Sequence, residues 1–260
     1  MNAPSILAQP PIWRESRLGL EMAALVRSPV YRGEGVADAA GQPVFLIPGF
    51  LAGDNSLGLM TRWLRRTGHR TRRAGIRVNA DCASAAIVRL EERLETVAAR
   101  SGTRVAVIGQ SRGGTFAKVL AVRRPDLVSG IVTLGSPVRE QLAVHPLVRA
   151  QVLLVGALGS LGAPGLFRRS CLWGECCTAF LKDLQAASLP AGVGYLGIYS
   201  RGDGIVDWRS CLDPAADELL EVDASHCGMG ADADAYHAIA AALTRWRETD
   251  AGGRTLKSAA

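Results

Sequence analysis

A serine flanked by glycines gives the first indication of chemistry in this sequence. Gly109–Gly113 reads Gly-Gln-Ser-Arg-Gly, with Ser111 at its centre. The run Val105–Ile108 before it has the length and β-branched residues of a buried strand, and Thr115–Arg124 after it has the apolar spacing of a helix that Pro125 ends. A serine at such a strand–turn–helix junction stands at the end of the strand, where it can act as a nucleophile. The alternative is an ordinary glycine-rich turn.

A serine hydroxyl is a weak nucleophile at neutral pH, so it needs a base and a group that orients the base. Residues of both types follow predicted strands. Asp203 follows Tyr195–Tyr199, and His226 follows Leu219–Val222. Because the carboxyl ends of parallel strands meet at one edge of a sheet, we expect Ser111, Asp203 and His226 to lie together there.

Other residues of the same types compete for these roles. Asp207 is the alternative acid, but Asp203 lies nearer to the predicted strand end. We expect Asp126 to be a helix stop or a turn residue, and the other histidines to lie on the surface. These histidines are His69, His145 and His237.

The elements that must position these residues alternate between strands and helices. Helical apolar spacing is present in Ile12–Arg27, in the segment around Leu57–Leu64, in Ser84–Arg100, and in a closing helix around Tyr236–Trp246. The alternation predicts the α/β class, with a mostly parallel, doubly wound sheet of about six strands flanked by helices. The predicted strands are Val44–Ile47, Thr71–Ile76, Val105–Ile108, Ile131–Leu134, Tyr195–Tyr199 and Leu219–Val222.

One segment interrupts this alternation. Residues 138–190 contain the apolar run Val152–Leu166, which is too short to span a bilayer. We expect an apolar helical cap or lid insertion over the site; the alternative is an additional core helix. The predicted organisation is a single domain over residues 1–250 with a flexible C-terminal tail at 251–260.

Four segments together resemble the α/β-hydrolase superfamily, and within it the small lipases and esterases. They are Leu46–Phe50, Gly109–Gly114, Leu134–Pro137, and Ile198–Asp203 followed by Ser225 and His226. The order serine, acid, histidine along the chain is also that of this superfamily. One departure is Pro48, where many relatives have a histidine. The change leaves the backbone N–H groups in place but affects how that loop is braced.

The resemblance implies roles for individual residues. Ser111 would be the nucleophile, His226 the general base and Asp203 the residue that orients it. The backbone N–H groups of Phe50 and Arg112 would form the oxyanion hole. The implied function is a serine carboxylic-ester hydrolase, lipase-like or esterase-like, acting on apolar acyl esters through an acyl-enzyme. Alternatives are an acyltransferase that uses the same triad and a non-catalytic binding module of the same fold.

Composition bounds the partners. The 260 residues are 48% hydrophobic and 21% charged, with a formal net charge of +6, as in an ordinary globular protein with a large core. A cluster of arginines in residues 62–73 shows no interleaving with aromatic residues and no recognised nucleic-acid motif, so we expect no nucleic acid. The expected partner is an apolar ester or lipid, and peripheral contact with a membrane is compatible with the charge. The sequence leaves the oligomeric state open.

The N-terminal residues lack a secretory signal, and no stretch reaches transmembrane length, so we expect a cytoplasmic protein. The six cysteines, Cys82, Cys171, Cys176, Cys177, Cys211 and Cys227, are then expected to be reduced. The spacing of Cys171, Cys176 and Cys177 matches no zinc motif; the alternative is a disulfide within this group or to Cys211 or Cys227. We expect no metal, and no organic cofactor is implied.

Overall fold

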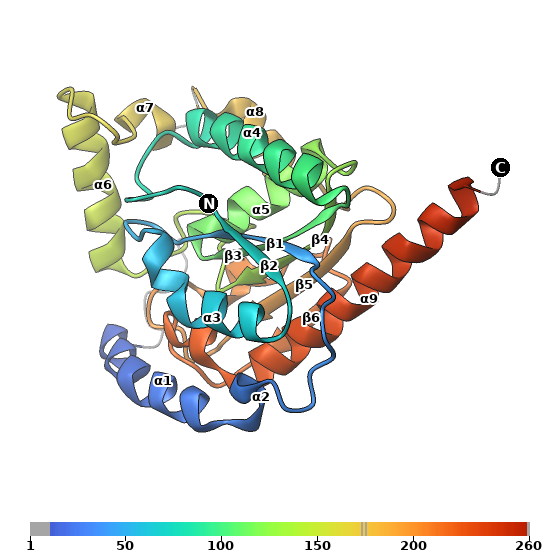
Figure 1. The fold of residues 1–260 in the computed structure, drawn as a ribbon. Helices are drawn as coiled ribbons and strands as arrows, with labels where there is room; N and C mark the ends of the chain where they lie inside the picture. Colours follow the sequence, from blue (N-terminus) through green and yellow to red (C-terminus); the bar gives the residue numbers. More distant parts are fainter. Residues whose placement is uncertain (1–10, 173, 175, 259–260) are drawn as a thin grey trace.

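A six-stranded parallel sheet organises the computed structural model, which describes residues 11–172, 174 and 176–258 (Figure 1). The spatial order of the strands is β2-β1-β3-β4-β5-β6. Every predicted strand overlaps an observed one, so the prediction of a parallel sheet of about six strands is confirmed. The strands are β1 (Pro43–Ile47), β2 (Arg70–Arg73), β3 (Val105–Gln110), β4 (Val128–Leu134), β5 (Gly194–Tyr199) and β6 (Glu218–Glu221).

The direction in which strands are added reverses between β1 and β3. From β1 the chain crosses to β2 at one edge, then returns to β3 on the other side of β1, and β4, β5 and β6 follow outward. Ligands in open parallel sheets bind beyond the carboxyl ends of the strands at such a reversal. The turns after β1 and β3, which carry Phe50 and Ser111, are therefore neighbours at this point.

Alternate side chains of each central strand pack on opposite faces of the sheet. In β1, Val44 and Leu46 belong to one hydrophobic cluster, whereas Phe45 and Ile47 belong to another. All five residues of β1 are buried. Both faces are covered by helices, which explains why these strands are apolar throughout rather than alternating with polar residues.

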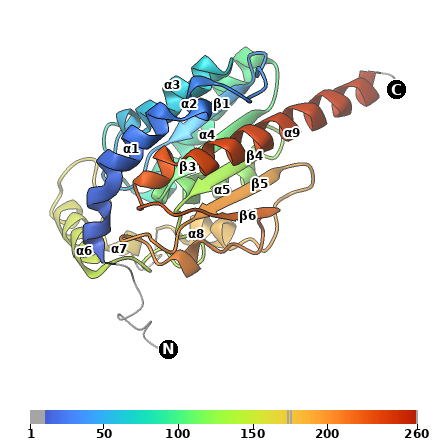
Figure 2. The ribbon, with the colours of Figure 1, turned by 90° about the horizontal axis from the view of Figure 1, so that it is seen from below.

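Helices cover the two faces (Figures 1 and 2). The first face carries α1 (Leu18–Arg27), α2 (Pro29–Arg32), α3 (Gly58–Arg66) and α9 (Ala233–Ser258), and the second carries α4 (Ala83–Ser101), α5 (Arg112–Arg123) and α8 (Thr178–Leu184). Short 3₁₀ helices form at η2 (Ile12–Arg17), η3 (Asp54–Leu57), η4 (Trp208–Cys211) and η5 (Gly228–Ala231).

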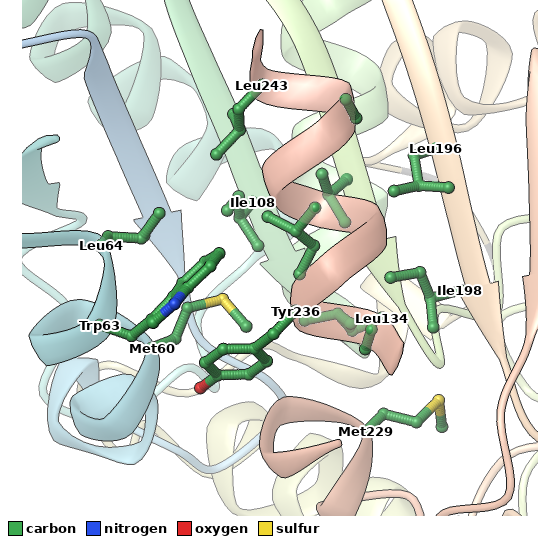
Figure 3. Close-up of a cluster of buried hydrophobic side chains, with 14 of the residues drawn as sticks. Met60, Trp63, Leu64, Ile108, Leu134, Leu196, Ile198, Met229, Tyr236 and Leu243 are labelled. Atoms are coloured by element: carbon green, nitrogen blue, oxygen red, sulfur yellow. The ribbon is translucent and has the colours of Figure 1, made fainter. Parts of the chain in front are cut away.

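Large aromatic side chains fill the first face. Figure 3 shows Trp63 of α3 beside Tyr236 of α9, with their ring centroids 4.5 Å apart. Trp246 of α9 lies so close to the sheet that a Cβ atom at Gly130 or Gly194 would come within 2.3 Å of its ring. These two glycines therefore allow α9 to pack directly on β4 and β5.

Residues 138–190 contain α6 (Pro146–Ser160), α7 (Arg169–Leu172) and α8. Helix α6 begins before the predicted apolar run, because His145 caps it by accepting a hydrogen bond from the N–H of Leu147 at 3.2 Å. Helix α8 packs on α5, where the rings of Phe116 and Phe180 are 5.5 Å apart. The segment thus contributes to the hydrophobic core through α8.

Two predicted boundaries differ from the structure. Strand β2 ends at Arg73 rather than Ile76, because Gly75 takes a left-handed conformation with φ +73°. The C-terminal tail predicted from residue 251 is wrong as far as Ser258, since α9 continues to that residue. Its sequence there contains no proline to stop the helix.

The remaining parts of the tail and N-terminus, residues 259–260 and 1–10, lie outside the described residues. The expectation of no secretory signal falls mostly on that N-terminal part. Among the described residues, no helix is both long enough and apolar enough to cross a membrane.

Candidate active site

Ser111 lies at a sharp turn between β3 and α5. Its backbone has φ +52° and ψ −122°, a conformation that side-chain-bearing residues rarely adopt. Its N–H donates to the carbonyl of Leu134 at 2.7 Å, which fixes the turn against β4. The strain is held by the surrounding structure, as is common at functional sites.

The two glycines of the motif make this turn sterically accessible. A Cβ atom at Gly109 would lie 2.3 Å from the carbonyl carbon of Gly113, and one at Gly113 would lie 2.1 Å from the carbonyl oxygen of Ile47. Neither backbone can move without displacing a strand. The Gly-x-Ser-x-Gly spacing is thus required by the close approach of β1, β3 and α5.

His226 and Asp203 form a buried pair. The Nδ1 atom of His226 lies 2.6 Å from Oδ2 of Asp203, and the two residues are 4% and 1% exposed. The other carboxylate oxygen, Oδ1, accepts hydrogen bonds from the N–H groups of Ile205 at 2.8 Å and Val206 at 2.7 Å. The Oδ1 atom of Asp203 thus binds the N–H groups of its own loop, whereas Oδ2 binds the imidazole of His226.

The charge of Asp203 changes the titration of His226. Burial lowers the pKa of His226, but the negative charge of Asp203, its hydrogen bond to the ring, and the charge of Glu15 together raise it more. The net pKa lies above the ordinary histidine value. Because Asp203 binds Nδ1, the neutral ring is expected to carry its proton there, which leaves Nε2 free to accept one.

Residues near the start of the chain hold the loops of this pair. One oxygen of Glu15 accepts from the N–H of Gly204 at 3.2 Å and the N–H of His226 at 2.9 Å, and the other accepts from Cys227 at 3.1 Å. Glu21 accepts from the N–H of Ser225 at 2.8 Å and from its hydroxyl at 2.6 Å. Sequence reasoning missed both glutamates, because they lie on a helix whose pattern shows only its apolar face.

The N–H groups of Phe50 and Arg112 lie on the two turns that meet at the sheet reversal. Among the described residues, neither group donates to a carbonyl or side-chain oxygen. Gly49 lies against the serine, since a Cβ atom there would be 3.3 Å from Cβ of Ser111 and 3.9 Å from its Oγ. The absent side chain leaves space beside the Ser111 hydroxyl.

Asn79 braces the turn that follows Pro48. It is 3% exposed, its side-chain amide donates to the carbonyl of Pro48 at 2.7 Å, and its carbonyl accepts from the N–H of Leu51 at 3.1 Å. The guanidinium of Arg112 donates to the carbonyl and to Oδ1 of Asn79, both at 3.0 Å. Asn79 therefore braces the loop in which Pro48 stands where many relatives have a histidine. No local pattern in the sequence marks Asn79 for this role.

A cavity of about 560 Å³ connects these groups and is lined by both Ser111 and His226. Most of its wall is apolar and comes from distant parts of the chain. The apolar lining includes Leu18 and Met22 of α1, Leu57 of η3, Met60 of α3, Val148 and Val152 of α6, Phe167, Phe180 of α8, and Val206. Such a cavity suits an apolar ligand with one polar group at the serine.

The competing residues have other surroundings. Asp207 caps η4 by accepting from the N–H of Arg209 at 3.0 Å, and Asp126 lies in a turn and pairs with Arg124. His145 caps α6, and His237 is exposed on α9. The structure thus brings together Ser111, Asp203 and His226 but none of these alternatives.

His69 is a correction, because we expected it on the surface and it is buried. Its Nδ1 lies 3.0 Å from the hydroxyl of Thr67 and 3.2 Å from the carbonyl of Leu64. Burial lowers the pKa of His69 to about 4. These contacts satisfy the ring within the helix–strand turn, so its role is structural.

Comparison with family models gives no match for this chain. Solved structures with similar folds include a lipase from Bacillus licheniformis in its mature form, with a TM-score of 0.59, 15% identity, and coverage of 80% of this chain and 94% of that one. A monoacylglycerol lipase from Paleococcus ferrophilus has a TM-score of 0.55, 15% identity, and coverage of 79% and 96%. A metagenomic carboxyl esterase has a TM-score of 0.57, 16% identity, and coverage of 87% and 84%.

These similarities extend over most of each chain at low sequence identity, so they concern the arrangement of strands and helices. The six-stranded parallel sheet flanked by helices agrees with them. The chain has the α/β-hydrolase fold.

Proposed function

We propose that this protein is a serine carboxylic-ester hydrolase, of the lipase or esterase type, that acts on apolar acyl esters. The observation that carries the proposal is the strained Ser111 in an apolar cavity that also contains His226, with His226 held by the buried carboxylate of Asp203. A binding module has no need for this combination of strain, burial and charge.

In the proposed mechanism Ser111 attacks the ester carbonyl. Nε2 of His226 takes the hydroxyl proton as the new C–O bond forms, and it returns the proton to the alcohol oxygen as the ester C–O bond breaks. Asp203 holds the ring in the required orientation and stabilises its positive charge. The acyl group then remains on Ser111 until water, activated by the same histidine, releases the acid.

We assign the developing oxyanion to the N–H groups of Phe50 and Arg112. Neither N–H group has an acceptor among the described residues, and this supports the role together with the space beside Gly49. Arg112 is the first residue of α5, so the positive end of the helix dipole adds to its N–H. Each such donor contributes about 3–4 kcal/mol to transition-state stabilisation in related reactions.

The cavity supports the substrate class. Its apolar wall favours an acyl chain over a sugar or a charged metabolite. Helix α6 carries exposed leucines, of which Leu147 and Leu154 are each 59% exposed. We infer that this outer surface of α6 contacts the lipid phase, while Val148 and Val152 on the same helix contact the bound ester.

The test is hydrolysis of a p-nitrophenyl ester series from acetate to palmitate by the wild type and Ser111→Ala. We expect activity in the wild type, with an optimum at medium or long chains, and loss of all but background activity in the variant. Ser129→Ala is a matched control, because the Ser129 hydroxyl is buried in β4, has no hydrogen-bond partner among the described residues, and lies outside the cavity lining. Equal activity of Ser111→Ala and wild type would refute the serine mechanism.

The same assay separates hydrolysis from acyl transfer. A short-chain alcohol is added and the acid and ester products are measured. We expect free acid as the main product; a product that is almost entirely ester would show a transferase with the same triad. No turnover by folded wild type on any ester, and no labelling of Ser111 by a fluorophosphonate, would contradict both activities.

A further inference from the structure

Four cysteine side chains from two distant parts of the chain meet beside the cavity. Cys82 is the residue before α4, whereas Cys171, Cys176 and Cys177 belong to the segment 138–190. Their Sγ atoms all lie within 4.8 Å of one another. Cys82 precedes Cys176 by 94 residues, so only the fold brings it to the other three.

The separations of the sulfur atoms fit one metal ion at their centre. Cys82 lies 3.7 Å from Cys177 and 3.8 Å from Cys176, and the last two are 3.6 Å apart. In a tetrahedral zinc site with Zn–S bonds of about 2.3 Å, neighbouring sulfur atoms are roughly 3.8 Å apart. The shortest separation, 3.1 Å between Cys171 and Cys176, needs only a small widening.

A pair of disulfides fits the cluster less well. A disulfide requires sulfur atoms about 2.05 Å apart, so every one of these pairs would have to close by 1 Å or more. All six cysteines are free thiols in the structure. The cluster therefore has the shape of a four-ligand site.

We propose that Cys82, Cys171, Cys176 and Cys177 bind one zinc ion as a structural site that fastens the segment 138–190 to the core. A site with four protein sulfur ligands is closed, so the ion stabilises structure and takes no substrate. Binding converts four thiols to thiolates and releases their protons to solvent, and the site then carries a net charge of −2.

The surroundings can stabilise this negative charge. Cys82 is the N-cap residue of α4, so the positive end of that helix dipole lies beside the cluster. The guanidinium of Arg112 interacts electrostatically with Cys82, Cys171 and Cys177, and it is held in place by the carbonyl of Asp81. Positive charge and a helix N-terminus thus face the cluster from the core side.

A zinc ion shared by these cysteines would hold a weakly packed part of the segment 138–190. Helix α7 has only four residues and buries none of them, so it has little stability of its own. It carries Cys171, while Cys177 is the N-cap residue of α8. A zinc ion shared with Cys82 would bind both helices to the start of α4, where the hydroxyl of Ser84 already donates to the carbonyl of Cys176 at 2.9 Å.

The site also bears on the cavity, because Cys171 and Cys177 form part of its wall. The ion would fix one side of the cavity without contacting the reacting atoms. The zinc proposal does not depend on the proposed ester hydrolysis, and metal content tests it without any assay of activity.

The experiment measures metal in the full-length protein purified under reducing, oxygen-free conditions. We expect about one zinc per chain by elemental analysis. Replacement by cobalt(II) should give the intense visible and near-ultraviolet bands of a tetrahedral thiolate site. In the wild type, a mercurial that titrates thiols should release the zinc in step with modification of the four cysteines, which avoids any question of variant folding.

Cysteine variants identify the ligands. Cys82→Ser and Cys176→Ser should each lower bound zinc at least about tenfold, since one ligand is lost from a four-coordinate site. Cys227→Ser is the matched control for metal content, because Cys227 is exposed and lies outside the cluster. Circular dichroism of each variant checks that the fold is retained.

Three results would overturn the proposal. One is a reduced wild-type protein that binds no zinc or cobalt and leaves the four thiols open to alkylation. The second is the formation of one or two disulfides within the cluster when the protein is reduced and then gently reoxidised with zinc present. Each disulfide would lower the mass of the protein by two hydrogens. Equal zinc loss in Cys227→Ser and Cys82→Ser would assign the metal elsewhere.

Discussion

The carboxylate of Glu15 accepts a hydrogen bond from the backbone N–H of His226 at 2.9 Å, so a residue near the start of the chain positions one near its end. The same carboxylate holds Gly204, next to Asp203, and Cys227. The two loops that carry the proposed acid and base are thereby connected by one side chain in addition to the bond between Asp203 and His226.

Glu15→Gln should lower kcat more than it changes KM. The amide keeps one acceptor oxygen but loses the charge and the second oxygen, so the three backbone donors are no longer all satisfied. We expect kcat to fall about tenfold, which corresponds to about 1.4 kcal/mol. Steady-state kinetics on a soluble ester measures this.

The control for Glu15→Gln is Glu34→Gln, which removes an exposed glutamate that pairs with Arg32 far from the cavity lining. We expect it to retain wild-type kinetics. Equal kinetics of both variants would show that Glu15 has no positioning role.

Asp203→Asn should reduce kcat by about 10³–10⁴-fold, because the amide can no longer hold and stabilise the histidine cation. Asp207→Asn should change kcat less than about threefold, since the Asp207 carboxylate pairs with Arg209 and contacts neither His226 nor Ser111 among the described residues. The two variants compare two aspartates of the same loop in one kinetic assay. A larger loss at Asp207 would reverse the assignment of the acid.

The pH profile of kcat/KM should fall toward acid with a midpoint above the ordinary histidine pKa of 6.5. The reason is that His226 must be neutral to accept the serine proton, and the net effect of its surroundings raises its pKa. Removing the charge of Glu15, which contributes to this increase, should move the midpoint to lower pH in Glu15→Gln. An unchanged midpoint in that variant would show that Glu15 has no electrostatic effect on His226.

The same shift predicts the sign of a stability effect. A histidine whose pKa is higher in the folded than in the unfolded chain stabilises the fold fully below the unfolded pKa, and this contribution is lost as pH rises through the folded pKa. Asp203→Asn should remove this pH-dependent contribution. Thermal unfolding of the wild type and of Asp203→Asn, measured from below pH 6.5 to above the raised pKa of His226, compares the pH dependence of their stabilities.

Ser111, the proposed nucleophile, could be singled out from the sequence because its signal is local. The strand, the glycines and the helix around Ser111 lie within about twenty consecutive residues, and the glycines are needed for contacts that the structure shows. Asp203 and His226 could be predicted because each follows its own strand. Their convergence depends on the parallel sheet, which the alternation of strands and helices indicated.

Residues that support the site could not be predicted in this way. Glu15, Asn79 and Cys82 act through contacts with segments far away in the chain, and nothing in their neighbouring residues marks them. His69 shows the same limit, since its burial depends on a turn between α3 and β2. Tertiary packing decides these cases, and no periodic pattern reports it.

Asn79→Ala tests the bracing of the turn after Pro48. The change removes the donor to the Pro48 carbonyl and one of the two acceptors that Asn79 offers to Arg112, so the Phe50 N–H should lose its fixed position. We expect kcat to fall about 10- to 100-fold, the size of a lost buried hydrogen bond to a charged or transition-state group, with a smaller change in KM. Kinetics combined with thermal unfolding separates this effect from global destabilisation. A loss of activity that only follows the loss of folded protein would contradict the positioning role.

The outer surface of α6 should matter for aggregated substrates and not for dissolved ones. Leu154 and Leu158 are 59% and 41% exposed, whereas Val148 and Val152 on the same helix line the cavity. Leu154→Ser combined with Leu158→Ser removes apolar area that can enter a lipid surface, at about 25 cal/mol per Å². We expect at least a severalfold loss of activity on emulsified long-chain esters and unchanged kcat/KM on a dissolved short-chain ester. Val88→Ser, at an exposed valine of α4 outside the cavity lining, should change neither. An equal loss on both substrates would assign these leucines to the catalytic cavity or to folding rather than to contact with lipid.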